Sequence, residues 1–330
     1  MKKMINDPDR VVQDMTDGLA AAYPDKVRKI PDTTVIVRND APVGGKVGLV
    51  SGGGSGHEPA HAGYVGRGML DAAVAGEVFT SPTPDQVLEA IKAVDAGEGV
   101  FLVIKNYTGD VLNFEMAAEL AEAEGISVEH VVVNDDVAVE DSTATTGRRG
   151  IAGTVFVHKI AGAKAEQGAS LADVKAVAER VVANVRSMGM ALTPCVMPAS
   201  GKAGFELEEG EMEVGIGIHG EPGIERKPVA RADAIAEELT GKVLSDLDFS
   251  GSDVAVMVNG MGATPEMELF LINKKVQSIL HDKGIHVYRT FVGDYMTSME
   301  MAGCSVTLLK LDEEMKELLD ATSDAPAFRI

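Results

Sequence analysis

The sequence predicts an α/β protein with two α/β domains, and two patterns lead to this prediction. Short β-branched runs alternate with segments of helical period, which is typical of a mostly parallel sheet with helices on both faces. An amphipathic segment over 171–187 then ends at Gly189, where a second set of apolar runs begins. We therefore predict a first domain over 1–188 with a three-layer, mostly parallel sheet, and a second over 189–330 with a mixed sheet and helices.

Each element follows from its own pattern. In the first domain, β-branched runs bounded by polar residues or glycine predict strands over 34–38, 46–50, 70–74, 100–104 and 128–133. Helical periods predict helices over 9–22, 84–96, 111–124 and 151–167. In the second domain we expect strands from Met190 and over 213–218, 253–258, 285–291 and 305–309, with helices over 229–241 and 265–283.

The composition excludes several classes of partner. A net charge of −21 over 330 residues repels nucleic acid phosphates and anionic membrane surfaces, so neither is expected as a partner. No run approaches the roughly 20 apolar residues of a membrane span, and the first residues lack the apolar region of a signal peptide. Cys195 and Cys304 lack CxxC spacing, which suits buried free thiols in a reducing compartment. We expect a cytoplasmic protein.

A glycine-rich segment is the first candidate site. Residues 51–61 read SGGGSGHEPAH and follow a predicted strand, with a helix expected to start at Pro59. Glycines let backbone N–H groups approach a small polar ligand closely, and a helix N-terminus adds partial positive charge. The segment places Gly54, Ser55 and His57 at the predicted site.

Three familiar motifs partly match the sequence, but each lacks a feature that its function requires. His57 and His61 match the spacing of a zinc-protease HExxH motif, but Pro59 disfavours one helix carrying both, so no metal is expected. The segment lacks the Lys and hydroxyl of a nucleotide-binding P-loop. A GxGxxG match over 215–220 is followed by Glu-Pro-Gly where a helix should begin, which argues against a dinucleotide site.

Two further segments carry chemistry. A predicted strand ends at Lys105 and leads to Asp110, which opens the next helix and is either a plain N-cap or a functional carboxylate. The strand over 213–218 delivers His219 to a loop rich in Gly and Pro. A histidine there is often only a loop residue, but the flanking glycines leave its ring open to a ligand.

Together with the segment 141–153, DSTATTGRRGIAG, these segments stand in an order that resembles the dihydroxyacetone-binding K subunit of bacterial dihydroxyacetone kinases, over essentially the whole chain. The resemblance implies that His219 attacks the substrate carbonyl to form a hemiaminal. It also implies that Gly54, Ser55, Lys105 and Asp110 line the substrate. His57 and Asp110 are the acid/base candidates, and the sequence does not decide between them.

The chemistry of so small a ligand favours a covalent tether. Dihydroxyacetone has about six non-hydrogen atoms, which limits noncovalent binding to roughly −9 kcal/mol. A bond from an imidazole to the ketone lifts that limit and rejects glycerol, which has no carbonyl.

Phosphoryl transfer also needs metal-bound phosphates, and this chain has no motif for them. The resemblance therefore implies no cofactor on this chain and a separate nucleotide-binding L subunit that carries ADP or ATP with Mg²⁺. That subunit is recharged by ATP or by the M subunit of a phosphotransferase system. A homodimer is implied as well. The alternative is a non-catalytic dihydroxyacetone-sensing paralogue that acts as coactivator of a transcriptional regulator; the presence of both His57 and Asp110 favours the kinase subunit.

Overall fold

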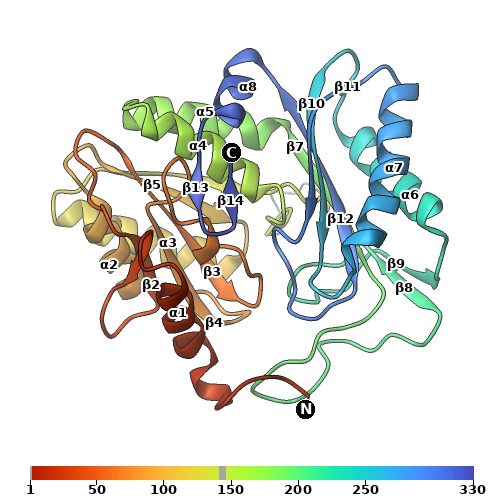
Figure 1. Ribbon diagram of the computed structural model, residues 1–330, viewed down its shortest axis with the longest axis horizontal. Coiled ribbons are helices and arrows are strands. Elements are labelled where there is room, and N and C mark those ends of the chain that lie inside the picture. The colour runs from red at the N-terminus through yellow and green to blue at the C-terminus, as the bar shows by residue number, and fades with distance from the viewer. Residues whose placement is uncertain (1, 141–145) are drawn as a thin grey trace.

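The computed structural model describes residues 2–140 and 146–330, which form two six-stranded sheets, a two-stranded hairpin and three layers of helices (Figure 1). The first sheet has the strand order β1 (Val27–Lys29), β2 (Val35–Arg38), β4 (Ala72–Val78), β3 (Gly48–Ser55), β5 (Val100–Lys105) and β6 (Val128–Val133). Strands β4, β3, β5 and β6 are parallel, and β1 and β2 add an antiparallel edge. The predicted mostly parallel sheet is confirmed.

Helices cover both faces of this sheet. The outer face packs against α2 (Pro84–Val94) and α3 (Thr108–Ala123), and the inner face against α4 (Thr154–Glu166) and α5 (Leu171–Asn184). Strand β5 is an unbroken apolar run because both of its faces are buried. Phe101 and Val103 face the inner helices, while Leu102 and Ile104 face the outer ones. A strand buried on both faces needs apolar residues at every position.

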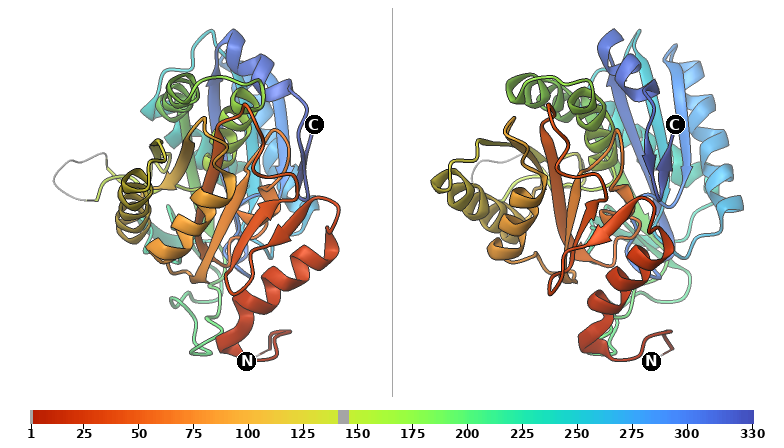
Figure 2. Two further views of the ribbon diagram at one scale, coloured as in Figure 1. Left: turned by 90° about the vertical axis from the view of Figure 1, so that its left-hand side faces the viewer. Right: turned by 60° about the vertical axis from the view of Figure 1, so that its left-hand side comes forward.

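The second sheet is mixed, as predicted. Its order is β11 (His286–Gly293), β10 (Asp253–Gly260), β12 (Gly303–Leu311), β7 (Val185–Ala191), β8 (Glu211–Val214) and β9 (Glu225–Pro228). Only the β10–β11 pair is parallel among the pairings within it. Helices α6 (Ala232–Asp246) and α7 (Glu266–Asp282) cover its outer face, and α8 (Glu313–Asp320) joins α4 and α5 on the inner face (Figure 2).

The remaining elements are short or peripheral. They are the 3-10 turns η1 (Pro8–Arg10) and η2 (Ala62–Tyr64), helix α1 (Val11–Ala22), and the hairpin of β13 (Asp324–Ala325) and β14 (Phe328–Arg329). Within the parts of the chain that the structure describes, no helix combines the length and the apolar character needed to cross a membrane.

Some predicted bounds are wrong. The helix expected over 171–187 ends at Asn184, because Val185 already pairs with Leu309 as the first residue of β7. The predicted domain boundary after residue 188 therefore falls inside a strand. The strand expected over 213–218 ends at Val214, because Gly215 has a φ of +78° and turns the chain. One apolar cluster includes residues of both sheets, so the two halves share a core.

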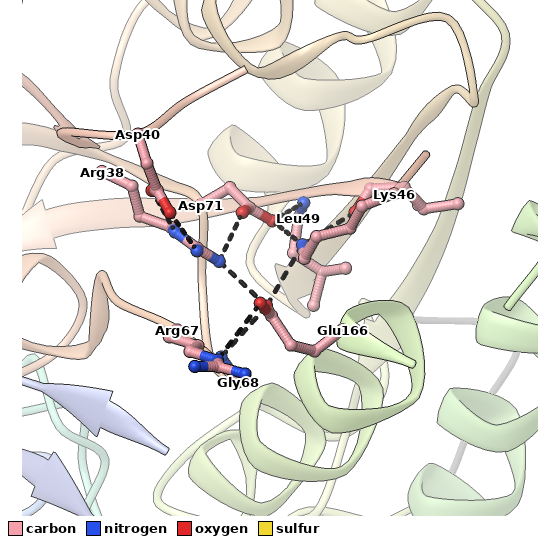
Figure 3. A network of polar contacts seen from close by, with 9 residues as sticks. Arg38, Asp40, Lys46, Leu49, Arg67, Gly68, Asp71 and Glu166 are labelled. Carbon is pink, nitrogen blue, oxygen red and sulfur yellow. Dashed lines mark hydrogen bonds and ion pairs between the residues drawn. The ribbon is translucent and has the colours of Figure 1, made fainter. Parts of the chain in front are cut away.

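A buried ion network ties the first sheet to the central helices (Figure 3). The Asp71 carboxylate accepts hydrogen bonds from Lys46 Nζ at 2.5 Å, from the Leu49 backbone N–H at 2.7 Å and from Arg38 Nη1 at 3.2 Å. The same Arg38 nitrogen donates to Glu166, the last residue of α4, at 2.9 Å. The side chains of Arg38, Lys46 and Asp71 are at most 5% exposed.

We predict that Asp71→Asn destabilises the protein by about 3–5 kcal/mol, because it leaves two buried cations without their shared carboxylate. Asp40 is the matched control: it pairs with the same Arg38, but its side chain is 62% exposed. Asp40→Asn should cost at most about 1 kcal/mol. Urea denaturation of both variants measures the difference, and equal losses would contradict this account.

Two buried histidines form a polar pair beside the central helices. His61 Nδ1 and His158 Nε2 are 2.9 Å apart, and both imidazoles are buried. Burial, and secondarily the charge of Lys105, lowers the pKa of His158 to about 3. The same two causes hold the pKa of His61 well below its ordinary value. Both imidazoles are therefore neutral in the folded protein at neutral pH.

This pair predicts a loss of stability in acid. An unfolded histidine has a pKa near 6.5, so below that pH unfolding takes up about two protons at these residues. Their contribution is fully present above about pH 6.5 and is lost toward pH 3, by up to roughly 2.7 kcal/mol per pH unit. Denaturation between pH 5 and 7.5 should show a slope smaller by about one proton in His158→Gln. The exposed His281→Gln is the control; an unchanged slope in both would refute the prediction.

Candidate functional site

Three adjacent parallel strands deliver side chains to one edge of the first sheet. Phe79 follows β4, His57 follows β3 and Tyr107 follows β5, and these strands are neighbours in the sheet. Lys105 is the last residue of β5, and Asp110 lies in the first turn of α3. The carboxyl ends of parallel strands are where open α/β sheets bind ligands. The site residues predicted from the first domain converge at this edge.

The glycine-rich segment itself is extended. The glycines expected to follow the predicted strand belong to β3 itself, which continues to Ser55. The helix expected from Pro59 is absent, and the chain forms only the 3-10 turn η2 there. The predicted helix charge is therefore absent from this segment. The Ser55 hydroxyl donates to the Gly76 carbonyl oxygen at 2.7 Å, so its side chain is already engaged.

One of the glycines is required by a close contact, and a second borders the charged groups of the site. A Cβ on Gly54 would lie 2.6 Å from the Thr80 nitrogen, so this glycine lets β3 pack against the chain after β4. A Cβ on Gly53 would lie 3.2 Å from Lys105 Nζ and 3.5 Å from Asp110 Oδ2. Gly53 thus keeps the space between these two charged groups open.

His219 reaches the site from the second sheet, on the connection between β8 and β9. Its ring makes edge contacts with three other rings: the centroid of His57 is 4.7 Å away, that of Phe79 5.3 Å and that of Tyr107 4.5 Å. Phe79 has a φ of +57°, a conformation that costs energy for a bulky residue and is found where function requires it. The imidazole is held between the rings and remains partly exposed.

Glu221 fixes the orientation of this imidazole. Its Oε1 accepts from His219 Nδ1 at 2.8 Å, and its Oε2 accepts from the backbone N–H of the same residue at 2.9 Å. A Cβ on Gly217 would lie 2.0 Å from Oε2, so only glycine admits the carboxylate there. Burial acts to raise the pKa of Glu221, but the hydrogen bond with His219 and nearby positive charge lower it to about 2. Glu221 is ionised at neutral pH.

His57 is buried and neutral. Its Nδ1 donates to the Thr297 carbonyl oxygen at 2.8 Å, which leaves Nε2 unprotonated and, among the described residues, without a hydrogen-bond partner. Burial, followed by the charges of Lys105 and His219, holds the pKa of His57 well below its ordinary value. His57 and His61 contact different partners, and no cluster of three or more metal-ligating side chains was found within 2–140 and 146–330.

Lys105 and Asp110 form the charged wall of the site. The Lys105 side chain is fully buried, and its Nζ has no hydrogen-bond partner in the described structure. Burial lowers the pKa of Lys105, although Asp110 and Glu221 act in the opposite direction. Asp110 is 4% exposed and is the third residue of α3. The N-cap is Tyr107, so the interpretation of Asp110 as a plain N-cap is wrong.

Sequence reasoning missed four residues that shape the site. Glu221 carried a signal, since it stands two residues after a histidine in a glycine-rich loop. Tyr107 lay within a segment already singled out. Phe79 and Thr297 had no local signal, because they reach the site only through the tertiary fold. The 141–145 part of the segment 141–153 lies outside the described residues.

Comparisons with known proteins identify the family to which the chain belongs. The sequence profile of the Dak1 domain matches residues 17–327. The chain is 58% identical over 315 residues to the dihydroxyacetone-binding subunit DhaK of a PTS-dependent dihydroxyacetone kinase of Listeria innocua, covering 95% of each chain. It is 44% identical over 352 residues to the corresponding subunit of the PEP-dependent kinase of Escherichia coli, covering 99% of each.

Solved structures show the same fold. The dihydroxyacetone kinase of C. freundii superposes with a TM-score of 0.93 at 36% identity, over 99% of this chain and 60% of that one. The dihydroxyacetone kinase operon co-activator DhaQ superposes with a TM-score of 0.90 at 37% identity, over 95% of this chain and 97% of that one. This chain therefore belongs to the Dak1 domain family, together with the dihydroxyacetone-binding subunits of dihydroxyacetone kinases.

Proposed function

We propose that this chain is the dihydroxyacetone-binding subunit of a dihydroxyacetone kinase. It holds dihydroxyacetone as a hemiaminal on Nε2 of His219 while a separate subunit donates a phosphoryl group to give dihydroxyacetone phosphate. The names of relatives that match nearly the full chain support the substrate and the reaction.

The observation that carries the proposal is the hydrogen bond between His219 and Glu221. Because Nδ1 of His219 faces an ionised carboxylate, the neutral imidazole carries its hydrogen on Nδ1 and has a free electron pair on Nε2. A nucleophile, its activating partner and a rigid frame are thus present together. The three rings around the imidazole leave it few orientations, which favours attack on one carbonyl position.

The other polar groups suit a small polyol. Among the described residues, neither the buried Nζ of Lys105 nor the buried Nε2 of His57 has a hydrogen-bond partner, and each such group costs free energy until a ligand pairs with it. Dihydroxyacetone offers two hydroxyls and, after addition, an alcohol at the former carbonyl. Asp110 and His57 are the two candidates in this proposal for the group that accepts the proton of the hydroxyl that attacks phosphorus. Gly54 contributes through backbone packing, and Ser55 through its bond to Gly76.

The phosphoryl donor is proposed to be a nucleotide-binding L subunit that carries ADP or ATP with Mg²⁺, recharged through a phosphotransferase-system M subunit. The words PTS-dependent and PEP-dependent in the names of two relatives support this arrangement. The proposal includes a cytoplasmic location, which suits the buried free thiols of Cys195 and Cys304.

It also includes a homodimer. Exposed Val229, Met267 and Leu271 line an apolar pocket of about 430 Å³ between α6 and α7, which offers a face for a second copy.

A second candidate function is dihydroxyacetone sensing as a coactivator. It is supported by the similarity to the operon co-activator structure. A sensor would bind the ligand without turnover, so activity separates the two candidates.

The proposal is tested by mixing this protein with an L subunit, a phosphoryl donor and dihydroxyacetone and measuring dihydroxyacetone phosphate. We expect turnover. His219→Ala should raise the apparent KM and relax discrimination against glycerol, because the tether is lost while the other groups remain. Tight ligand binding with no product would favour the sensing function. No binding at all would refute both.

Asp110 and His57 are distinguished by two variants. We predict that Asp110→Asn still binds dihydroxyacetone but loses turnover by about 10²–10⁴-fold, the usual contribution of a general base. Because the Asp110 carboxylate also acts on the buried Lys105 ammonium, the free energy of unfolding of the variant is measured beside its turnover. His57→Asn keeps a donor for the Thr297 carbonyl and removes Nε2. If Asp110→Asn retains turnover and His57→Asn loses it, the base is His57.

A further inference from the structure

We propose that Glu221 holds the tethered substrate in a charged form: the adduct is an alkylimidazolium ion paired with Glu221, and each dihydroxyacetone that binds takes up one proton. This inference rests on the proposed function, since it requires a carbonyl ligand on His219. It assigns a positioning and charge-stabilising role to a residue that acts through the imidazole.

The bond changes balance as follows. The electron pair on Nε2 of His219 forms the bond to the carbonyl carbon, and the π pair of the carbonyl moves onto oxygen. The alkoxide then takes one proton from water or buffer and becomes a hydroxyl. If Nδ1 keeps its hydrogen, the ring carries one positive charge and the protein has gained one proton in total. If Nδ1 loses it, the ring is neutral and no net proton is gained.

The contacts of Glu221 favour the charged ring. The carboxylate is held by two donors of one residue, Nδ1–H and the backbone N–H of His219, so it cannot turn away when the ring reacts. If Nδ1 gave up its hydrogen, its electron pair would face an ionised oxygen 2.8 Å away in a partly buried site. That arrangement is repulsive, whereas an imidazolium–carboxylate pair is among the strong hydrogen bonds.

The surroundings leave this role to Glu221. The rings that contact His219 are neutral at neutral pH: burial first, and then positive charge, holds the pKa of His57 low, while burial raises the pKa of Tyr107 well above its ordinary value. Lys105 and Arg149 are the nearby cations that act on the Glu221 carboxylate. Arg149 already donates to Asp136 at 2.8 Å, so part of its charge is balanced locally.

Calorimetry of dihydroxyacetone binding, in buffers of different ionisation enthalpy at one pH, counts the protons exchanged. We expect an uptake of about one proton per ligand for the wild-type protein. Glu221→Gln keeps an acceptor for Nδ1–H but removes the charge. We expect it to lose the uptake and to weaken binding by about 10- to 100-fold, the worth of a hydrogen bond to a charged group.

Glu213→Gln is the matched control. The Glu213 carboxylate accepts from the Gly223 backbone N–H at 3.0 Å and from Arg226 at 2.9 Å, so it anchors the same loop without contacting His219. This variant should retain proton uptake and most of the affinity. Equal losses in both variants would show that loop anchoring, rather than charge at the imidazole, explains the effect.

A measurement on the wild-type protein does not depend on the variants folding. With ¹⁵N-labelled histidine, the saturated complex should show a protonated Nδ1 in the His219 adduct and an alkylated Nε2. An adduct with unprotonated Nδ1, or binding without proton uptake, would overturn the inference and leave the proposed function intact. Failure of the wild-type protein to bind dihydroxyacetone would instead refute the proposed function.

Discussion

The site depends on the direct contact between two short segments, residues 56–57 just after β3 and residues 297–299 in the connection between β11 and β12 of the second sheet. Met299 N donates to the Gly56 carbonyl at 2.7 Å, and Thr297 N donates to the His57 carbonyl at 3.2 Å. The His57 imidazole returns a hydrogen bond to the Thr297 carbonyl at 2.8 Å. These bonds join the two sheets next to the site. The bond from the imidazole also sets the tautomer of His57. The contact that joins the two sheets therefore also fixes which ring nitrogen of His57 is unprotonated.

The same contact holds the His219 imidazole in place although the residue lies in a loop. His219 comes from the second sheet, and the Ile218 carbonyl before it accepts a hydrogen bond from Ser298 at 2.5 Å, within the segment that also contacts His57. The ring then enters a space bounded by residues of the first sheet. Neither half of the chain contains the whole site. Buried groups that have no hydrogen-bond partner among the described residues, such as Lys105 Nζ, remain there at a cost in stability, which is typical of sites that bind a ligand.

The sequence predicted the two sheets well where strands are apolar runs, as in β5 and β6, and less well where glycine or a chain reversal intervenes. Glycines normally disfavour strands, so β3 was expected to end before its glycine run; there, burial on both faces and close packing against the chain after β4 outweigh propensity. Of the two interpretations of Asp110 left open by the sequence, the plain N-cap is wrong because α3 begins at Thr108. His57, Lys105, Asp110 and His219 could be singled out from the sequence because each lies near the end of a predicted strand or the start of a predicted helix. Phe79 and Thr297 were not, since only the packing of the two sheets brings them to the site.

The central claim is that the ketone carbon of dihydroxyacetone becomes tetrahedral on His219. The most direct measurement is ¹³C NMR of dihydroxyacetone labelled at its carbonyl carbon, in a complex with saturating protein. The account predicts that the bound carbon gives a signal in the range of an sp³ carbon with oxygen and nitrogen substituents, and that His219→Ala abolishes this signal. A bound species that retains an sp² carbonyl signal in the wild-type complex would contradict it.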